Sequence, residues 1–179
     1  RSLTDNTGVA SNYSLSSATL DINEKPISLS GTKVYDALTT AASSALTITG
    51  TVGGQDLTLS GNGTLATGAD VGTNKTINTT GLSLGDGVSG TPGTASNYSL
   101  VGGIHQMSVT QKPVTISGSR FYDSTTNVSS SDINTFNDTV GGQTLAITGS
   151  GSVSTAVAGS GKTISLGTLT LTDGTGLAS

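Results

Sequence analysis

The residues of this sequence best suited to chemistry are two Tyr-Asp pairs and one histidine. Tyr35-Asp36 and Tyr122-Asp123 recur in the same local context, 87 residues apart. A tyrosine offers an apolar face for stacking and a hydroxyl for hydrogen bonding, and a neighbouring carboxylate could transfer a proton. His105 is the only histidine and the other candidate proton carrier. These residues define the two chemical readings to weigh, which are carbohydrate binding and acid–base catalysis.

The supply of catalytic residue types is too small for an enzyme. A Ser-His-Asp triad would have to use His105, which lies in a two-residue insertion and is expected to be a solvated turn residue. One histidine and no cysteine exclude a zinc site built on those ligands. We expect no catalytic residue, no cofactor and no metal site. A weak Ca²⁺ site among Asp86, Asp132 or Asp138 stays open as an alternative.

A structural role explains the Tyr-Asp pairs better. The sequence has six aromatic residues, and four are tyrosines at repeated positions: Tyr13, Tyr35, Tyr98 and Tyr122. Among Leu, Ile, Val and Thr they are the largest apolar side chains, and each could bury on the order of 150–250 Å² in a core. Asp36 and Asp123 follow at strand ends, where an aspartate commonly folds back on backbone amides as an Asx-turn. We interpret these six residues as a structural motif.

An internal repeat organises the whole chain. "KPISLSGTKVYD" begins at Lys25 and "KPVTISGSRFYD" at Lys112, an offset of 87 residues. "TVGGQ" occurs at 51–55 and 139–143, and "ASNYSL" returns after an offset of 85 residues. Self-similarity at a fixed period is typical of a modular array.

The phase of the repeat predicts the domain boundaries. Pro26 and Pro113 fix the backbone and make stiff connectors between modules. We expect residues 1–25 to be the terminal strand of a preceding or neighbouring module. Residues 26–112 would then form a complete module, and residues 113–179 a second module that lacks its last strand.

Each module is predicted to consist of short strands. Apolar residues alternate with period two after each Lys-Pro dipeptide, as in half-buried strands. The dipeptide Gly53-Gly54 between two such runs predicts a tight hairpin. Gly61 and Gly63 share an inward face, which predicts a bend or a close backbone approach. A one-residue slip of the pattern at Gly81, repeated at Gly167, predicts a β-bulge.

The composition favours an all-β protein outside the nucleic-acid-binding and membrane classes. Serine and threonine make up 59 of the 179 residues, and no segment shows a sustained helical pattern. The net charge is −4 and the seven basic residues are scattered, so we expect neither nucleic-acid binding nor membrane insertion. We predict two tandem, small, immunoglobulin-like β-sandwich modules in an elongated arrangement, with a β-solenoid as the runner-up.

Four segments carry a family resemblance: "KVYDALTT", "TVGGQDLTLSG", "DVGTNKTINTTGLSL" and "SNYSL…DINEKPISLSG". They resemble the tyrosine–aspartate–glycine (YDG) repeats of large bacterial surface proteins, including filamentous-haemagglutinin-type adhesins. The chain departs from the motif at its glycine, which is Ala37 or Ser124 here, and a Cβ atom disfavours a left-handed turn. The resemblance implies a secreted or surface-anchored, non-enzymatic fibre without an active site.

We weigh two functions on this basis. In the first, residues 10–23 complete the sheet of a neighbouring module and build an extracellular filament or biofilm matrix, so that the partner is the chain itself, as a homopolymer or tandem array. This inter-subunit strand would use Asn12, Tyr13, Leu15, Leu20 and Ile22. In the second, loops at the end of a sandwich bind a glycan or a host protein, with Phe121 and Phe136 as the available aromatic residues. Both imply a bacterial cell-surface or extracellular location.

Overall fold

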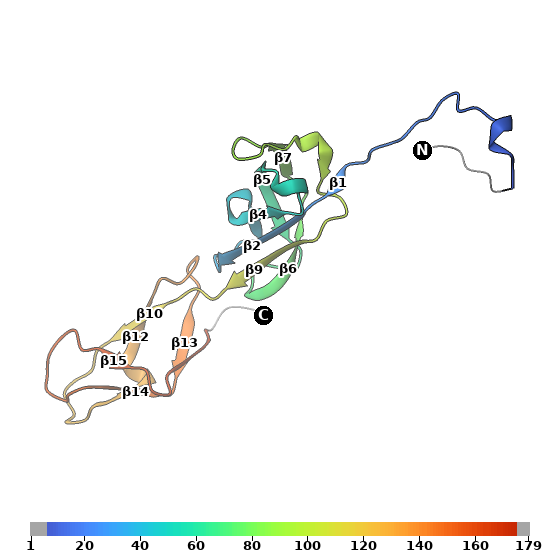
Figure 1. The fold of residues 1–179 in the computed structure, drawn as a ribbon. Coiled ribbons are helices and arrows are strands. Elements are labelled where there is room, and N and C mark those ends of the chain that lie inside the picture. The colour runs from blue at the N-terminus through green and yellow to red at the C-terminus, as the bar shows by residue number, and fades with distance from the viewer. Residues whose placement is uncertain (1–6, 175–179) are drawn as a thin grey trace.

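Short strands make up most of the secondary structure in the computed structural model, which describes residues 7–174 (Figure 1). The first group of strands is β1 (Lys25–Pro26), β2 (Ser28–Val34), β3 (Thr40–Ala42), β4 (Leu46–Thr49), β5 (Leu57–Leu65), β6 (Gly72–Asn78), β7 (Leu82–Asp86), β8 (Tyr98–Ser99) and β9 (His105–Thr110). The second is β10 (Thr115–Gly118), β11 (Asn127–Ser129), β12 (Ile133–Asn137), β13 (Leu145–Thr148), β14 (Ser150–Val153), β15 (Ile164–Ser165) and β16 (Thr170–Asp173). Five one-turn 3₁₀ helices connect them: η1 (Ala10–Asn12), η2 (Ser43–Ala45), η3 (Val52–Gly54), η4 (Ala95–Asn97) and η5 (Ser130–Asp132).

We call β1–β9 module 1 and β10–β16 module 2, because no pairing between described strands joins the two groups. Figure 1 shows them in succession along an elongated molecule, with residues 7–24 leading away from the far end of module 1. The predicted all-β class is confirmed.

Module 1 is held together by one nearly closed sheet. Its strand order is β3-β5-β6-β9-β2-β4, and β7 also pairs with β5. The last strand in sequence, β9, therefore lies inside the sheet, antiparallel to β6 and parallel to β2. This continuous order differs from the two separate sheets of an immunoglobulin-like sandwich, so that finer part of the prediction is not shown.

The core of module 1 depends on β9. Met107 and Val109 are about 1% and 2% exposed and pack with Leu29 of β2 and Ile77 of β6. A second cluster joins Tyr98 to buried residues at the opposite end of the sheet. The alternation of apolar residues thus places one face of each central strand in the same core.

Among its described strands, module 2 has no counterpart of β1, β8 or β9. Its pairings form three small sheets, β10-β12, β11-β14-β15 and β13-β16. Among the described residues no strand lies between β10 and β15, the counterparts of β2 and β6.

The predicted β-bulge is confirmed in both modules. The first half of β5 pairs with β7 (Gly61↔Leu82) and the second half with β6 (Thr64↔Asn78), which leaves one extra residue on the side of Gly81. In module 2 the pairings of β13 with β16 and of β14 with β15 show the same one-residue difference. Gly167 lies there one position before Thr168, the counterpart of Gly81, and both glycines have positive φ. The predicted close approach is also present, because a Cβ on Gly61 would lie 2.0 Å from the Gly81 carbonyl oxygen.

The predicted hairpin at Gly53-Gly54 is wrong. Both glycines have positive φ, as a tight turn requires, but the strands that flank them do not pair with each other. β4 pairs with β2, whereas β5 pairs with β3, β6 and β7. The Gly-Gly dipeptide correctly indicated a turn. Which strands pair is decided by packing in the core, and this packing separates β4 from β5.

Candidate functional site

The N-terminal segment carries a strand sequence without a core. Tyr13, Leu20 and Ile22 are 70%, 85% and 91% exposed, and residues 13–24 form no strand. Their counterparts in module 1, by the repeat, are Tyr98, Met107 and Val109, which are all buried. We call residues 10–23 the donor segment, because the same side-chain pattern fills the sheet of module 1.

Two strands of module 2 end early beside the missing one. In module 1, residues 32–34 of β2 pair with β9 alone, and so do residues 72–76 of β6. The corresponding residues of module 2 lie outside β10 and β15, which keep only the parts that pair with other strands. Among the described residues no strand pairs with β10 or β15 on the side where β9 pairs with β2 and β6, and we call this place the open position.

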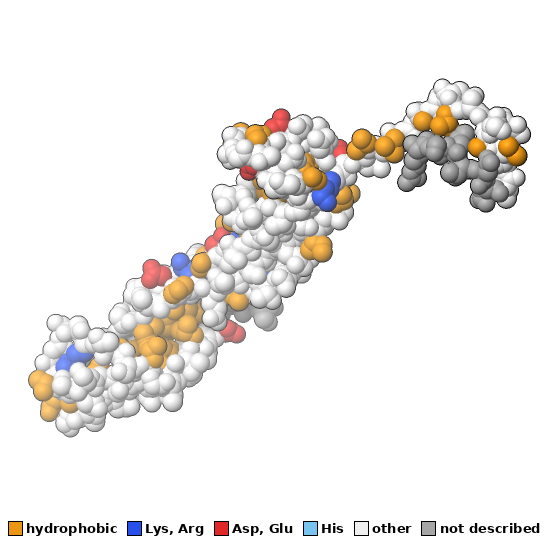
Figure 2. All heavy atoms as spheres, viewed as in Figure 1, with side chains coloured by type: hydrophobic (Ala, Val, Ile, Leu, Met, Phe, Trp, Pro, Cys, Tyr) orange, Lys and Arg blue, Asp and Glu red, His pale blue; other side chains and the backbone are white. Residues whose placement is uncertain are grey.

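The core of module 2 is correspondingly open. Six of its residues that match buried positions of module 1 are only half-buried: Val114, Ile116, Leu145, Val153, Ile164 and Leu169. Val128, the counterpart of Ala41, and Ile133 stay buried. Apolar side chains are visible at the surface of module 2 in the space-filling view (Figure 2). Partly exposed apolar side chains beside strand edges that no described strand pairs with are the features on which β-strand addition depends.

The pairing of β9 defines the register that a donor would take. Met107 lies opposite Gly31 of β2 and Lys75 of β6. The offset of 87 residues maps these positions to Leu20, Gly118 and Lys162. In that register Leu20 and Ile22 face the core, whereas Thr19 and Asp21 face outward.

Hydrogen bonds of the Tyr98 side chain hold β8, the strand that precedes β9 in module 1; we call this arrangement the tyrosine lock. The Tyr98 side chain is 5% exposed, its hydroxyl donates to Gln55 Oε1, and the Val52 amide donates to the Tyr98 hydroxyl at 3.0 Å. Tyr13 is the repeat counterpart of Tyr98, and Gln143 is the counterpart of Gln55. The donor segment thus includes the group that would close this lock.

The Tyr-Asp pair of module 1 begins a turn stapled by a lysine. Asp36 Oδ1 accepts from the Leu38 amide at 2.9 Å, which is the predicted Asx-turn, and from Lys33 Nζ at 2.7 Å. Lys33 Nζ also donates to the carbonyl oxygens of Leu38 and Thr40. The aspartate and the cation therefore hold the backbone between β2 and β3.

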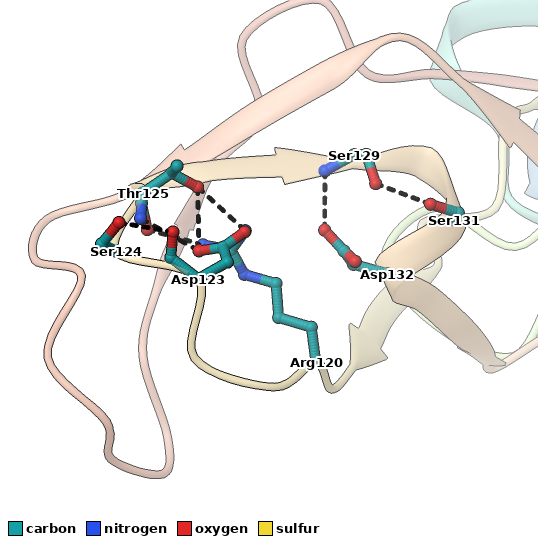
Figure 3. Close-up of polar contacts among 7 residues, drawn as sticks. All are labelled: Arg120, Asp123, Ser124, Thr125, Ser129, Ser131 and Asp132. Atoms are coloured by element: carbon teal, nitrogen blue, oxygen red, sulfur yellow. Dashed lines mark hydrogen bonds and ion pairs between the residues drawn. The ribbon is translucent and has the colours of Figure 1, made fainter.

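Module 2 repeats this staple with arginine (Figure 3). Asp123 Oδ1 accepts from the Thr125 amide at 2.9 Å, and Asp123 Oδ2 lies 2.5 Å from Arg120 Nη1. Arg120 Nη2 donates to the Thr125 carbonyl at 2.7 Å. The carboxylates act on local backbone and a neighbouring cation, as a turn-forming element does.

The expectation for the motif's missing glycine is corrected by the backbone. Ala37 and Ser124 have φ of 61° and 65°, so both turns are left-handed although neither residue is glycine. The Asx-turns and the cation staples on either side hold a conformation that costs an L-residue about 1–2 kcal/mol.

The two turn aspartates have lowered pKa values. Burial alone would raise the pKa of Asp36, but hydrogen bonds from Lys33 and the Leu38 amide, and the lysine charge, bring it below its ordinary value. The Thr125 amide is the largest influence on Asp123, whose pKa is lowered further by the Thr125 hydroxyl and the Arg120 charge. Both carboxylates therefore favour the ionised form.

The other chemical candidates occupy structural places. His105 begins β9 and is half-buried, with Nε2 2.6 Å from the Leu100 carbonyl oxygen, which corrects the expected solvated turn. Asp86 accepts from the Ala95 amide, and Asp132 from the Ser129 amide. Within residues 7–174 no three His, Asp or Glu side chains gather as metal ligands. None of the helices described there has the length and apolar character of a membrane span.

Tyr122 was predicted to be buried in a core and Phe136 to lie in a loop, and the structure places both elsewhere. Tyr98 is buried and Tyr35 half-buried, but Tyr122 is 69% exposed, so it is not a core residue. Phe121 is 97% exposed, whereas Phe136 is half-buried in β12. The shallow groove over β2, β4 and β9 has a volume of about 640 Å³ and is lined mainly by small hydroxyl side chains, with no aromatic ring for a sugar.

Sequence reasoning missed the glutamines. Gln55 binds the tyrosine of the inserted segment, and Gln143 Nε2 donates to the Tyr35 hydroxyl at 2.7 Å, which links the two modules. The signal was present in the repeated "TVGGQ". A turn does not require glutamine at its last position, yet glutamine occurs there in both copies.

Comparison with protein families finds a similarity in the first repeat. A YDG domain matches residues 23–109, a range that ends at Val109 of β9. The searches of curated proteins and of solved structures each found no match.

Proposed function

We propose that this chain is a non-enzymatic structural repeat of an extracellular bacterial fibre or adhesin, whose units join head to tail by strand complementation. The donor segment of one unit inserts between β10 and β15 of its neighbour and takes the place that β9 holds in module 1. The tandem modules then form a continuing elongated array, with the chain itself as partner. In a longer chain the next repeat supplies the same strand.

The observation that carries the proposal is the match between the open position of module 2 and the exposed apolar pattern of the donor segment. Module 1 has β9 between β2 and β6, module 2 has no described strand between β10 and β15, and the donor segment repeats the pattern of β8 and β9. The two complementary parts lie at opposite ends of the molecule (Figure 1). Such a heterologous contact continues into a filament instead of closing a dimer.

The energetics favour insertion. Burying Leu20 and Ile22 would contribute about 1.5–3 kcal/mol each. Each backbone hydrogen bond gained along the two strand edges would add roughly 0.5–1.5 kcal/mol. The YDG domain at residues 23–109 is the observation on which we extend the resemblance to surface and secreted bacterial repeat proteins to this chain.

Sedimentation of the purified 179-residue chain tests the proposal. We expect concentration-dependent polymers, and monomers when residues 1–24 are deleted. Leu20→Asp would place a carboxylate among the apolar side chains between β10 and β15 and weaken association by about 100-fold or more. Thr19→Asp, the matched control on the outward face of the same segment, should still polymerise. A monomeric parent chain, or equal polymerisation of Leu20→Asp and Thr19→Asp, would refute strand complementation.

A further inference from the structure

The contact between the two modules uses the tyrosine of the Tyr-Asp motif. Gln143, in the turn between β12 and β13, donates from Nε2 to the Tyr35 hydroxyl at 2.7 Å. Tyr35 follows the last residue of β2, and both side chains are half-buried. One module thus presents a tyrosine at its end, and the next module approaches with a glutamine.

In module 1 the corresponding glutamine, Gln55, makes its hydrogen bond through the amide oxygen and not through the amide nitrogen. Gln55 Oε1 accepts from the Tyr98 hydroxyl, and within the described residues Gln55 Nε2 has no acceptor. Gln143 shows the opposite half of the same pattern, because its Nε2 is engaged with Tyr35 and no tyrosine occupies its Oε1. A glutamine amide has separate donor and acceptor atoms, so one residue can hold both tyrosines.

The tyrosine at the end of module 2 is uncovered. Tyr122 is 69% exposed and Phe121 before it is 97% exposed, whereas Tyr35 is half-buried where module 2 follows. Two adjacent exposed aromatic side chains at the end of an elongated molecule indicate a surface that another unit covers.

We infer that Tyr122 of one copy receives Gln55 of the next copy, so that the junction between subunits repeats the junction between modules. This inference rests on the proposed strand complementation. A donor segment in the place of β9 would continue into module 1 of its own chain through Glu24–Pro26, as β9 continues into module 2 through Gln111–Pro113. Because the two connectors have the same length and follow corresponding strands, the next copy should be oriented as module 2 is after module 1. Gln55 Nε2 would then donate a hydrogen bond to the Tyr122 hydroxyl.

The same geometry gives Gln143 two tyrosines in the polymer. Its Nε2 stays with Tyr35 of its own chain, and its Oε1 receives the hydroxyl of Tyr13 from the incoming copy. Each junction therefore joins strand insertion to the orientation of the next module, and the polymer is expected to be stiff instead of jointed.

Cross-linking tests this contact directly because the chain has no cysteine. We would place cysteines at both positions, Tyr122→Cys and Gln55→Cys, in one chain. The long tyrosine and glutamine side chains hold the two backbones too far apart for a disulfide, so a short bismaleimide is the reagent. We expect a ladder of covalent multimers on a denaturing gel, lost when Leu20→Asp is added.

Two controls calibrate the result. The pair Tyr35→Cys and Gln143→Cys should react within one chain, at monomer mass. The pair Tyr122→Cys and Thr39→Cys should give little product, because Thr39 lies at the opposite end of β5 from Gln55. Tyr122→Phe should weaken polymerisation about fivefold, the effect of one hydrogen bond.

The outcomes separate the two proposals. Polymers that sediment normally but cross-link no better through Gln55 than through Thr39 would overturn the Tyr122–Gln55 junction and leave strand complementation standing. A parent chain that stays monomeric would overturn both.

Discussion

At the scale of single residues, the Tyr-Asp motif is a turn that its own side chains hold in a left-handed conformation. Asp36 and Asp123 accept hydrogen bonds from backbone amides two residues ahead, and Lys33 of β2 or Arg120, just after β10, pairs with the aspartate of its turn. Exposed ion pairs of this kind contribute little energy by themselves. Their effect is to orient the tyrosine that precedes them, which at Tyr35 meets the next module.

Restoring the motif's glycine should stabilise the fold. At φ near +60°, Ala37→Gly or Ser124→Gly relieves about 1–2 kcal/mol of strain and adds roughly 0.5–1 kcal/mol of backbone entropy to the unfolded chain. We expect a net gain of about 0.5–1 kcal/mol per site in urea unfolding. The control Ala42→Gly, at φ −67°, should lose stability instead. Equal losses of stability at all three positions would contradict the presence of backbone strain at Ala37 and Ser124.

The two turns should make stability depend on pH at acid values. The folded-state pKa of Asp36 and of Asp123 is below the ordinary 3.8, so the unfolded chain binds more protons below about pH 4. Their contribution is complete above that pH and is lost as the pH falls through the folded-state pKa. The advantage of the parent chain over Asp36→Asn or Asp123→Asn should therefore shrink between pH 5 and about pH 2.

Urea unfolding across this pH range measures that advantage. The matched control is Asp21→Asn, which removes a carboxylate from the extended N-terminal segment, away from both turns. A difference between parent and variant that is the same at every pH would contradict the assignment of the lowered pKa values to these turns.

At the scale of elements, strands β5 and β6–β7 cross closely at a pair of glycines. Gly61 has φ of 82°, and a Cβ there would lie 2.0 Å from the Gly81 carbonyl oxygen. The repeat places Gly149 in the same role, 2.1 Å from the Thr168 carbonyl oxygen. The bulge opposite these glycines turns one long strand into two segments that serve different parts of the sheet.

Gly61→Ala should therefore destabilise module 1 by about 3 kcal/mol or more, because the contact is with backbone that cannot move aside. Gly53→Ala is the matched comparison. It has φ of 59° but nothing within 4 Å, so it should cost only about 1 kcal/mol. Thermal unfolding monitored by circular dichroism gives both values. Similar losses for the two variants would exclude close packing as the cause.

At the scale of the whole molecule, the modules differ most in β9, which lies inside the sheet of module 1 and has no counterpart among the described strands of module 2. Removing an edge strand would leave one new edge, whereas the open position of module 2 leaves two edges and an uncovered core. Module 2 should therefore open more easily than module 1 when no donor is bound.

Hydrogen exchange with a donor peptide checks this expectation. A chain lacking residues 1–24 should exchange residues 115–122 and 159–165 faster than the matching residues 28–35 and 72–78. A peptide of residues 10–25 should slow exchange in the first two segments and leave the last two unchanged. The same peptide with Leu20→Asp is the control. Uniform exchange in both modules, or protection by both peptides, would contradict an open position in module 2.

The sequence by itself determined the strands, the repeat and its phase. Period-two alternation, the bulge at Gly81 and the Asx-turn at Asp36 are local properties, so they were readable without partners. The exposed donor pattern was equally visible, because comparison with the second copy marks the positions that a core needs.

Only the tertiary structure decided which strands pair. It placed β9 between β6 and β2, separated the strands flanking Gly53-Gly54, and brought Gln143 to Tyr35. Pairing depends on burial of both faces and on contacts between residues far apart in sequence, which no local pattern encodes. For the same reason the glutamines of "TVGGQ" looked like turn residues until their tyrosine partners were seen.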